Sequence, residues 1–177
     1  EQKLNFTIII FFLVITSMSC FFSKEVIPLL IKSKGMEDIY KLAIILIMAY
    51  NYRPVYVAAN NRLFYVEKTK ALLKVTTVAA IISVCLNMFF IYFLGVQGAT
   101  YALFIALMYM GYSGFFIKEF KESEGTEHYP IFWLLLTLFL TVGVYFAVEF
   151  SIWTKALIAL IFLVCGFSAF YSVNRKK

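Results

Sequence analysis

Six blocks of about 20 apolar residues follow one another along the chain, and they restrict the possible folds more than any other feature. A helix rises 1.5 Å per residue, so about 20 apolar residues cross the roughly 30 Å of hydrocarbon in a bilayer. Hydrophobic residues make up 63% of the 177 residues and charged residues 15%, which is more apolar surface than a soluble domain can bury. The sequence therefore predicts an all-α membrane protein. Its six transmembrane helices are expected at about 5–22, 39–60, 71–94, 96–117, 131–149 and 153–172.

The basic residues lie at the ends of these blocks. A formal net charge of +6 could indicate nucleic-acid binding, but no basic face is present, so no nucleic-acid partner is predicted. With both termini in the cytoplasm, nine basic residues fall inside and four outside, as the positive-inside rule requires. The nine are Lys3, Arg62, Lys68, Lys70, Lys118, Lys121, Arg175, Lys176 and Lys177, and the four are Lys24, Lys32, Lys34 and Lys155.

Two polar stretches divide the chain. Residues 118–130 carry charges of both signs and end at Pro130, which predicts a cytoplasmic linker. This linker separates four helices in residues 1–117 from two further helices and a basic tail in 131–177. Residues 23–38 hold a short apolar run that contains Pro28, and they predict a partial helix at the outer surface.

The second block contains an arginine, Arg53. On insertion scales a guanidinium within hydrocarbon costs about 2.5–3.5 kcal/mol. Helical spacing places Ala49, Arg53, Tyr56 and Asn60 on one stripe, and Pro54 is expected to loosen the turn before it. Arg53 either lines a cavity and binds an anion such as a phosphate, or extends its side chain to the cytoplasmic headgroups. The residues alone leave both interpretations open.

Other polar and small residues within the blocks have structural interpretations. Asn87 in the third block needs a partner, which is either a neighbouring helix or a substrate. The fourth block carries a seam of small residues that allows close helix packing. The seam consists of Gly98, Ala102, Ala106, Gly111 and Gly114. The cysteines, Cys20, Cys85 and Cys165, are interpreted as small packing residues.

The sequence offers little for enzymatic chemistry. Asp38 is the sole aspartate, the glutamates lie at block ends or in loops with Glu149 nearest to a span, and the sole histidine, His128, lies in the linker. No Ser-His-Asp set, Cys/His cluster or phosphate-binding glycine loop is present. The sequence predicts a protein that is not an enzyme and uses no cofactor or metal.

Two stretches are similar to a known family. Phe21–Tyr50 has the form of an outer loop followed by a helix. Glu67–Leu103 combines a Lys-rich loop, a helix with Asn87 near its outer end, and a Gly-x-x-Gly-Ala turn before a helix rich in small residues. Together they resemble bacterial Wzx-type flippases of O-antigen and capsule repeat units, in the superfamily of multidrug, oligosaccharidyl-lipid and polysaccharide exporters.

The resemblance implies a transporter of two six-helix lobes around a cationic cavity. The chain would match the ninth to fourteenth helices, which form the C-terminal lobe and two extra helices, and the N-terminal lobe would be its partner. It would translocate undecaprenyl-diphosphate-linked oligosaccharide across the bacterial inner membrane by alternating access, in contact with membrane lipids. Arg53, Tyr56, Asn60 and Asn87 would be the substrate-binding residues. Two alternatives stay open: a polytopic O-antigen polymerase or glycosyltransferase, and a non-transporting membrane scaffold subunit.

Overall fold

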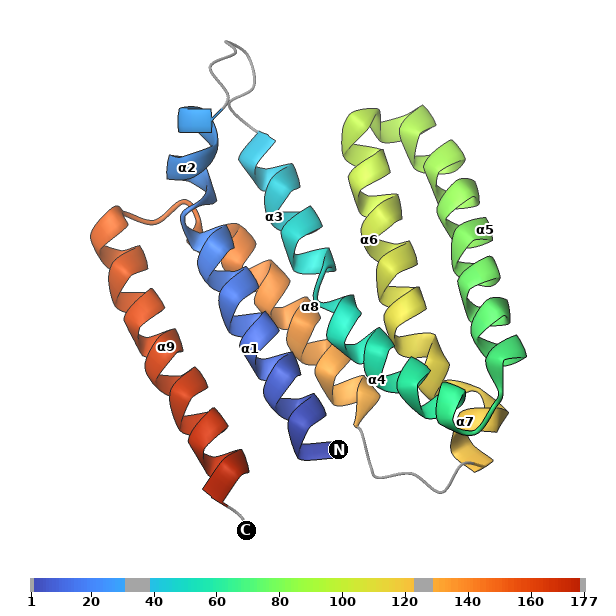
Figure 1. The fold of residues 1–177 in the computed structure, drawn as a ribbon. Helices are drawn as coiled ribbons and strands as arrows, with labels where there is room; N and C mark the ends of the chain where they lie inside the picture. Colours follow the sequence, from blue (N-terminus) through green and yellow to red (C-terminus); the bar gives the residue numbers. More distant parts are fainter. Residues whose placement is uncertain (1, 31–38, 123–128, 176–177) are drawn as a thin grey trace. The chain divides into compact units, whose positions relative to one another are not determined.

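The computed structural model describes residues 2–30, 39–122 and 129–175, and over these residues it contains helices and no strands (Figure 1). The elements are α1 (Gln2–Phe21), α2 (Ser23–Leu30), α3 (Ile39–Ala49), α4 (Tyr52–Tyr65), α5 (Thr69–Leu94), α6 (Val96–Ser113), the 3-10 helix η1 (Gly114–Phe116), α7 (Lys118–Glu122), α8 (Pro130–Ala147) and α9 (Ile152–Arg175). They divide into two compact units. The terminal unit comprises the described residues of Lys3–Asn51 and Leu136–Lys177, and the central unit those of Tyr52–Leu135.

The described helices confirm the predicted all-α fold, and their length and composition support a membrane protein. Among the described residues, five helical segments are long and apolar enough to cross a membrane: Leu4–Phe21, Ile39–Tyr65, Thr69–Leu94, Val96–Phe116 and Pro130–Ala147. The sixth predicted span falls on α9, where the apolar stretch with described side chains is Ile152–Ile161. The grouping of helices by chain order into 1–117 and 131–177 differs from the two compact units and stays a prediction.

The second predicted span is not one continuous helix. It is interrupted by a turn at Tyr50–Asn51, so that α3 ends at Ala49 and α4 begins at Tyr52. Pro54 explains the position of this break, because proline has no N–H to donate and its ring excludes the carbonyl four residues earlier, that of Tyr50. The expected loosening before Pro54 is therefore confirmed, whereas the continuous helix over 39–60 is wrong.

The predicted linker is partly helical. Its first five residues form α7, where Phe120 is buried and its ring meets the ring of Phe115 at 4.8 Å between centroids. Burial of this aromatic pair stabilises a turn of helix within a charged stretch. Similarly, the partial helix predicted in 23–38 is confirmed as α2 over Ser23–Leu30. The predictions on Lys32, Lys34, Asp38, His128, Lys176 and Lys177 lie outside the described residues, as do the side chains of Lys3, Cys165 and Arg175.

Small residues bring the helices of the central unit together. Only Gly95, at φ +60°, separates α5 from α6, and Gly98 follows against the α5 backbone. A Cβ at Gly98 would lie 2.2 Å from the Phe90 carbonyl oxygen, and one at Gly111 would lie 2.8 Å from Tyr52 Cβ. The predicted seam is therefore confirmed: it packs α6 closely against α5 at one end and against α4 at the other.

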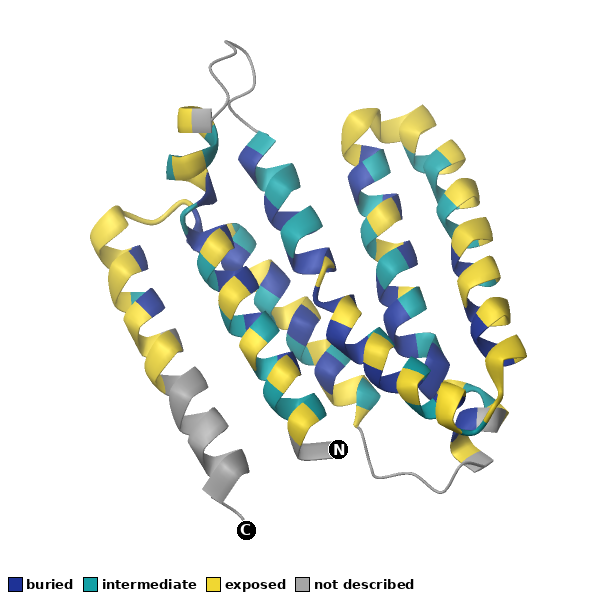
Figure 2. Ribbon diagram, in the orientation of Figure 1, coloured by how far each residue is buried: buried dark blue, intermediate teal, exposed yellow. Residues whose placement is uncertain are grey.

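In the terminal unit, α1 buries one face, whereas α3 has no exposed residue between Ile39 and Ala49 (Figure 2). In α1, Ile9, Leu13 and Cys20 are buried, whereas apolar residues on the other face, such as Phe11, are exposed. The thiol of Cys20 donates to the Ile44 carbonyl of α3 at 3.7 Å, so this cysteine has the packing role that the sequence predicts. Cys85 in the central unit is exposed, and its predicted packing role is wrong.

Candidate functional site

The break between α3 and α4 is held by a buried asparagine. Asn51 donates its side-chain amide to the Met48 carbonyl at 3.1 Å, at the end of α3. Its side-chain oxygen lies 3.0 Å from the Thr16 hydroxyl of α1, for which it competes as acceptor with the Phe12 carbonyl at 2.7 Å, and both Thr16 and Asn51 are buried. The side chain of Asn51 thus satisfies a carbonyl at the end of the helix and ties the break to a neighbouring helix. The only sign of this role in the sequence is an asparagine three positions before Pro54.

Three of the predicted site residues lie along α4. Arg53 is exposed, and Tyr56 and Asn60 are half-buried. Positions separated by three and four residues share a helix face, so these side chains form a polar stripe. The prediction that Ala49 belongs to this stripe is wrong, because Ala49 lies in α3 and is buried.

The charge on this stripe is uncompensated. Arg53 lies in the first turn of α4, where no acidic residue is present, and the N-terminal end of a helix carries a partial positive charge. In the described part of the chain, no acidic side chain lies within ion-pair distance of Arg53. The start of α4 is therefore a cationic position within a candidate membrane span, and water, a headgroup or an anionic ligand must solvate it.

Asn87 is not part of this stripe. It donates its side-chain amide to the Ser83 carbonyl of its own helix, α5, at 2.8 Å. No hydrogen bond in the described structure joins it to Arg53, Tyr56 or Asn60. An amide can satisfy one of its N–H groups on the carbonyl four residues earlier, so the described structure shows no neighbouring-helix partner for Asn87, and its role as a substrate-binding residue stays a prediction.

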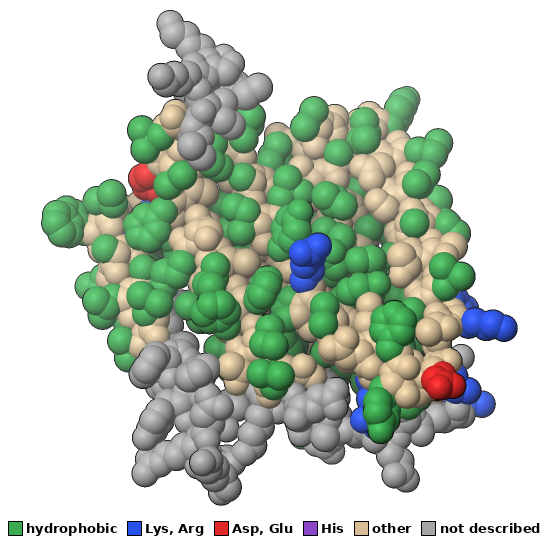
Figure 3. Space-filling view, viewed as in Figure 1, with side chains coloured by type: hydrophobic (Ala, Val, Ile, Leu, Met, Phe, Trp, Pro, Cys, Tyr) green, Lys and Arg blue, Asp and Glu red, His purple; other side chains and the backbone are tan. Residues whose placement is uncertain are grey.

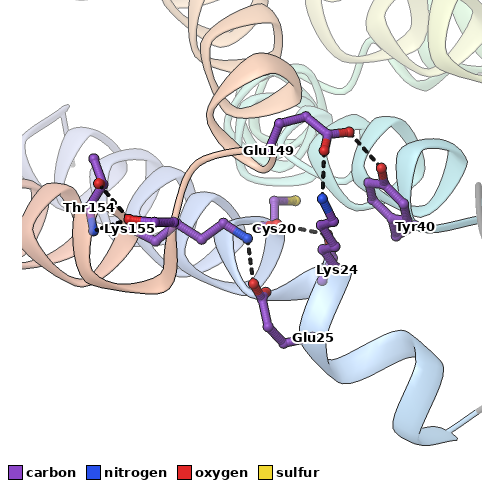
Figure 4. A network of polar contacts seen from close by, with 9 residues as sticks. Cys20, Lys24, Glu25, Tyr40, Glu149, Thr154 and Lys155 are labelled. Carbon is purple, nitrogen blue, oxygen red and sulfur yellow. Dashed lines mark hydrogen bonds and ion pairs between the residues drawn. The ribbon is translucent and has the colours of Figure 1, made fainter.

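A second polar group, which we call the lysine–glutamate cluster, lies in the terminal unit (Figure 4). It comprises Lys24, Glu25, Tyr40, Lys41, Glu149 and Lys155. Glu149 accepts hydrogen bonds of 2.6 Å from both Lys24 and Tyr40, and Lys41 lies 3.4 Å from the same carboxylate. The bonds from Lys24 and then Tyr40 lower the pKa of Glu149 to about 2, and the bond to Glu149 raises the pKa of Lys24.

The other half of the lysine–glutamate cluster is a buried ion pair. The Lys155 ammonium is fully buried and lies 2.6 Å from a carboxylate oxygen of Glu25. Removing one partner of a buried pair costs roughly 3–5 kcal/mol, and the lower end applies here because the Glu25 side chain is 34% exposed. Sequence reasoning missed these pairs because their members are 125 and 130 positions apart. The cluster ties α2 to α3, to the α8–α9 connection and to the first turn of α9, which is a structural role.

The arrangement contains no metal centre that the described residues reveal. Within 2–30, 39–122 and 129–175, no group of three or more His, Cys, Asp or Glu side chains is placed to hold a metal ion. Comparisons with protein-family models, curated proteins and solved structures found no match to this chain. The candidate site is therefore assessed from its own residues: the interrupted span and the cationic stripe that begins its second half.

Proposed function

We propose that this chain is the C-terminal lobe, with two extra helices, of a flippase that translocates lipid-linked oligosaccharides across the bacterial inner membrane. The proposal rests chiefly on one observation. A candidate membrane span is interrupted at Tyr50–Asn51, and the half-helix that follows carries the exposed Arg53 in its first turn, where no acidic side chain of the described residues pairs with it. Transporters commonly use such discontinuous helices, whose N-terminal ends bind anionic groups of the substrate.

The chemistry of the stripe suits a diphosphate. A guanidinium binds phosphate oxygens with paired hydrogen bonds, and the N-terminal end of α4 adds its partial positive charge. Tyr56 and Asn60 continue along the same side of α4 with a hydroxyl and an amide group, which are suited to sugar hydroxyls. A polyprenyl chain would stay in the bilayer while the charged head passes along this stripe.

The interruption also supports alternating access. Pro54 and the turn before it replace regular helix with a point that can change its backbone angles. Asn51 and Thr16 hold the α3 side of this point. The resemblance of Phe21–Tyr50 and Glu67–Leu103 to flippases supports this substrate class in the proposal, and the cationic half-helix supports Arg53 as the residue that would bind the substrate.

The test is a transport assay on the full transporter that contains this chain. It would be reconstituted in liposomes with a fluorescent lipid-diphosphate oligosaccharide. We expect Arg53→Ala to lower the translocation rate about tenfold and Arg53→Lys to restore part of it, because lysine keeps the charge but loses the paired geometry. Lys68→Ala is the matched control, since it removes an exposed cation next to α5 without touching the stripe. Translocation by Arg53→Ala at the wild-type rate, with equal protein in the liposomes, would refute the proposal.

A further inference from the structure

The central unit contains a cavity that is separate from the α4 stripe. Its volume is about 550 Å³, within the range of sites that bind small ligands. It lies between α5, α6, η1 and the beginning of α8, and most of its lining is apolar. The residues that matter here are Lys74, Val78, Ile105, Tyr109, Ser113 and Leu134. None of the stripe residues lines this cavity, so the proposed flippase site leaves it unexplained.

Two polar groups of the cavity lack partners. Lys74 is exposed, and no acidic side chain of the described residues forms an ion pair with it. The hydroxyl oxygen of Ser113 is buried and has no hydrogen-bond partner. A serine within a helix can donate to the carbonyl four residues earlier, but Ser113 does not. The cavity therefore offers a cation and an unused hydroxyl donor.

The surrounding charge favours an anion at this end of the cavity. Lys74 lies in the second turn of α5, whose first turn has no acidic residue and whose N-cap, Lys68, makes no side-chain cap bond. Basic side chains gather where α4 leads into α5 (Figure 3). The junction of these two helices, residues 62–74, carries Arg62, Lys68, Lys70 and Lys74 against Glu67. This excess of positive charge adds to the partial positive charge of the helix end.

We propose that the cavity binds an anionic phospholipid of the surrounding membrane. The phosphate accepts hydrogen bonds from the Lys74 ammonium and the Ser113 hydroxyl, and an acyl chain occupies the apolar space beside Val78, Ile105 and Leu134. An apolar lining of this size makes favourable contacts with a hydrocarbon chain but not with a free anion. The cavity should therefore bind a lipid in preference to inorganic phosphate. The inference does not rest on the proposed flippase function, since it invokes neither Arg53 nor translocation.

The test is lipid retention by the whole purified chain, measured by native mass spectrometry. The chain is incubated in detergent with equal amounts of phosphatidylglycerol and phosphatidylcholine. Wild type should retain phosphatidylglycerol at least fivefold better than phosphatidylcholine. Lys74→Gln should lower phosphatidylglycerol retention about fivefold, and Ser113→Ala about twofold. Lys68→Gln is the matched control, because it removes the same charge at the same helix end from outside the cavity.

Several outcomes would overturn this inference. Equal retention of the two lipids by wild type would exclude headgroup recognition. If Lys74→Gln and Lys68→Gln lower phosphatidylglycerol retention equally, the cavity is excluded as the binding site. Binding of inorganic phosphate as tight as that of phosphatidylglycerol would show a free-anion site. If Lys74→Gln does not fold, Ile105→Trp serves instead: it fills the cavity, keeps the charge and should lower phosphatidylglycerol retention equally. Unchanged retention by that variant would also overturn the inference.

Discussion

Two glycines allow a direct test of the packing that joins α5 to α6. A Cβ at Gly98 would lie 2.2 Å from the Phe90 carbonyl oxygen and 2.4 Å from its carbon, so the two backbones must separate by about 1 Å. Such overpacking costs about 1–3 kcal/mol, and the overlap with rigid backbone places Gly98→Ala at the upper end. The better helix propensity of alanine offsets about 1 kcal/mol of this destabilisation. We expect Gly98→Ala to lower the free energy of unfolding by about 2 kcal/mol.

Gly143 of α8 provides the matched control. A Cβ there would meet nothing within 4 Å, so Gly143→Ala makes the same chemical change without overlap. We expect this variant to be as stable as wild type or more stable, by up to about 1 kcal/mol. Both variants would be purified in detergent, and their unfolding by denaturant followed by circular dichroism. Equal stability of the two variants would refute the close approach of α6 to the α5 backbone at Gly98.

Two further predictions concern the terminal unit. The variants Asn51→Leu and Thr16→Val would be measured singly and combined. We expect their effects on the free energy of unfolding to be coupled by about 0.6–1 kcal/mol. If the two effects simply add, the hydrogen bond between these side chains is contradicted. For Glu149, the pKa of about 2 in the folded chain lies below the ordinary value of 4.5. Its contribution to stability is therefore complete above about pH 4.5 and is lost as the pH falls towards 2. The difference in melting temperature between wild type and Glu149→Gln should vanish over that range, and a constant difference would contradict the assignment.

The sequence predicted the features that depend on local pattern. Apolar block length located the spans, and small residues at helical spacing located the seam on α6. Pro54 predicted a weakened turn, but not that Asn51 would stabilise the break, because that depends on Thr16 lying beside it on another helix.

Other features depended on distant partners or on competing local bonds. Glu149 and Lys155 stand at helix ends in the sequence, and nothing local shows that their partners are Lys24 and Glu25. Asn87 was expected to need another helix or a substrate, but the carbonyl of Ser83 was an equally good acceptor. The sequence pattern therefore did not predict which distant residues pair. It also did not predict whether a side chain bonds to a local or a distant acceptor.

The central claim is that Arg53 faces water within the span, and the reactivity of cysteine at that position tests it most directly. Cys85 and Cys165 are first replaced by serine, and Cys20 is left in place because it is buried. Arg53→Cys is then introduced, and membranes that contain this variant are treated with a charged, membrane-impermeant methanethiosulfonate. The reagent needs a thiolate, which forms in water and not in hydrocarbon. Phe139→Cys is the control, at an apolar position on α8 that is 75% exposed. The account predicts rapid modification of Arg53→Cys and none of Phe139→Cys; equal protection of both would place Arg53 against lipid and contradict it.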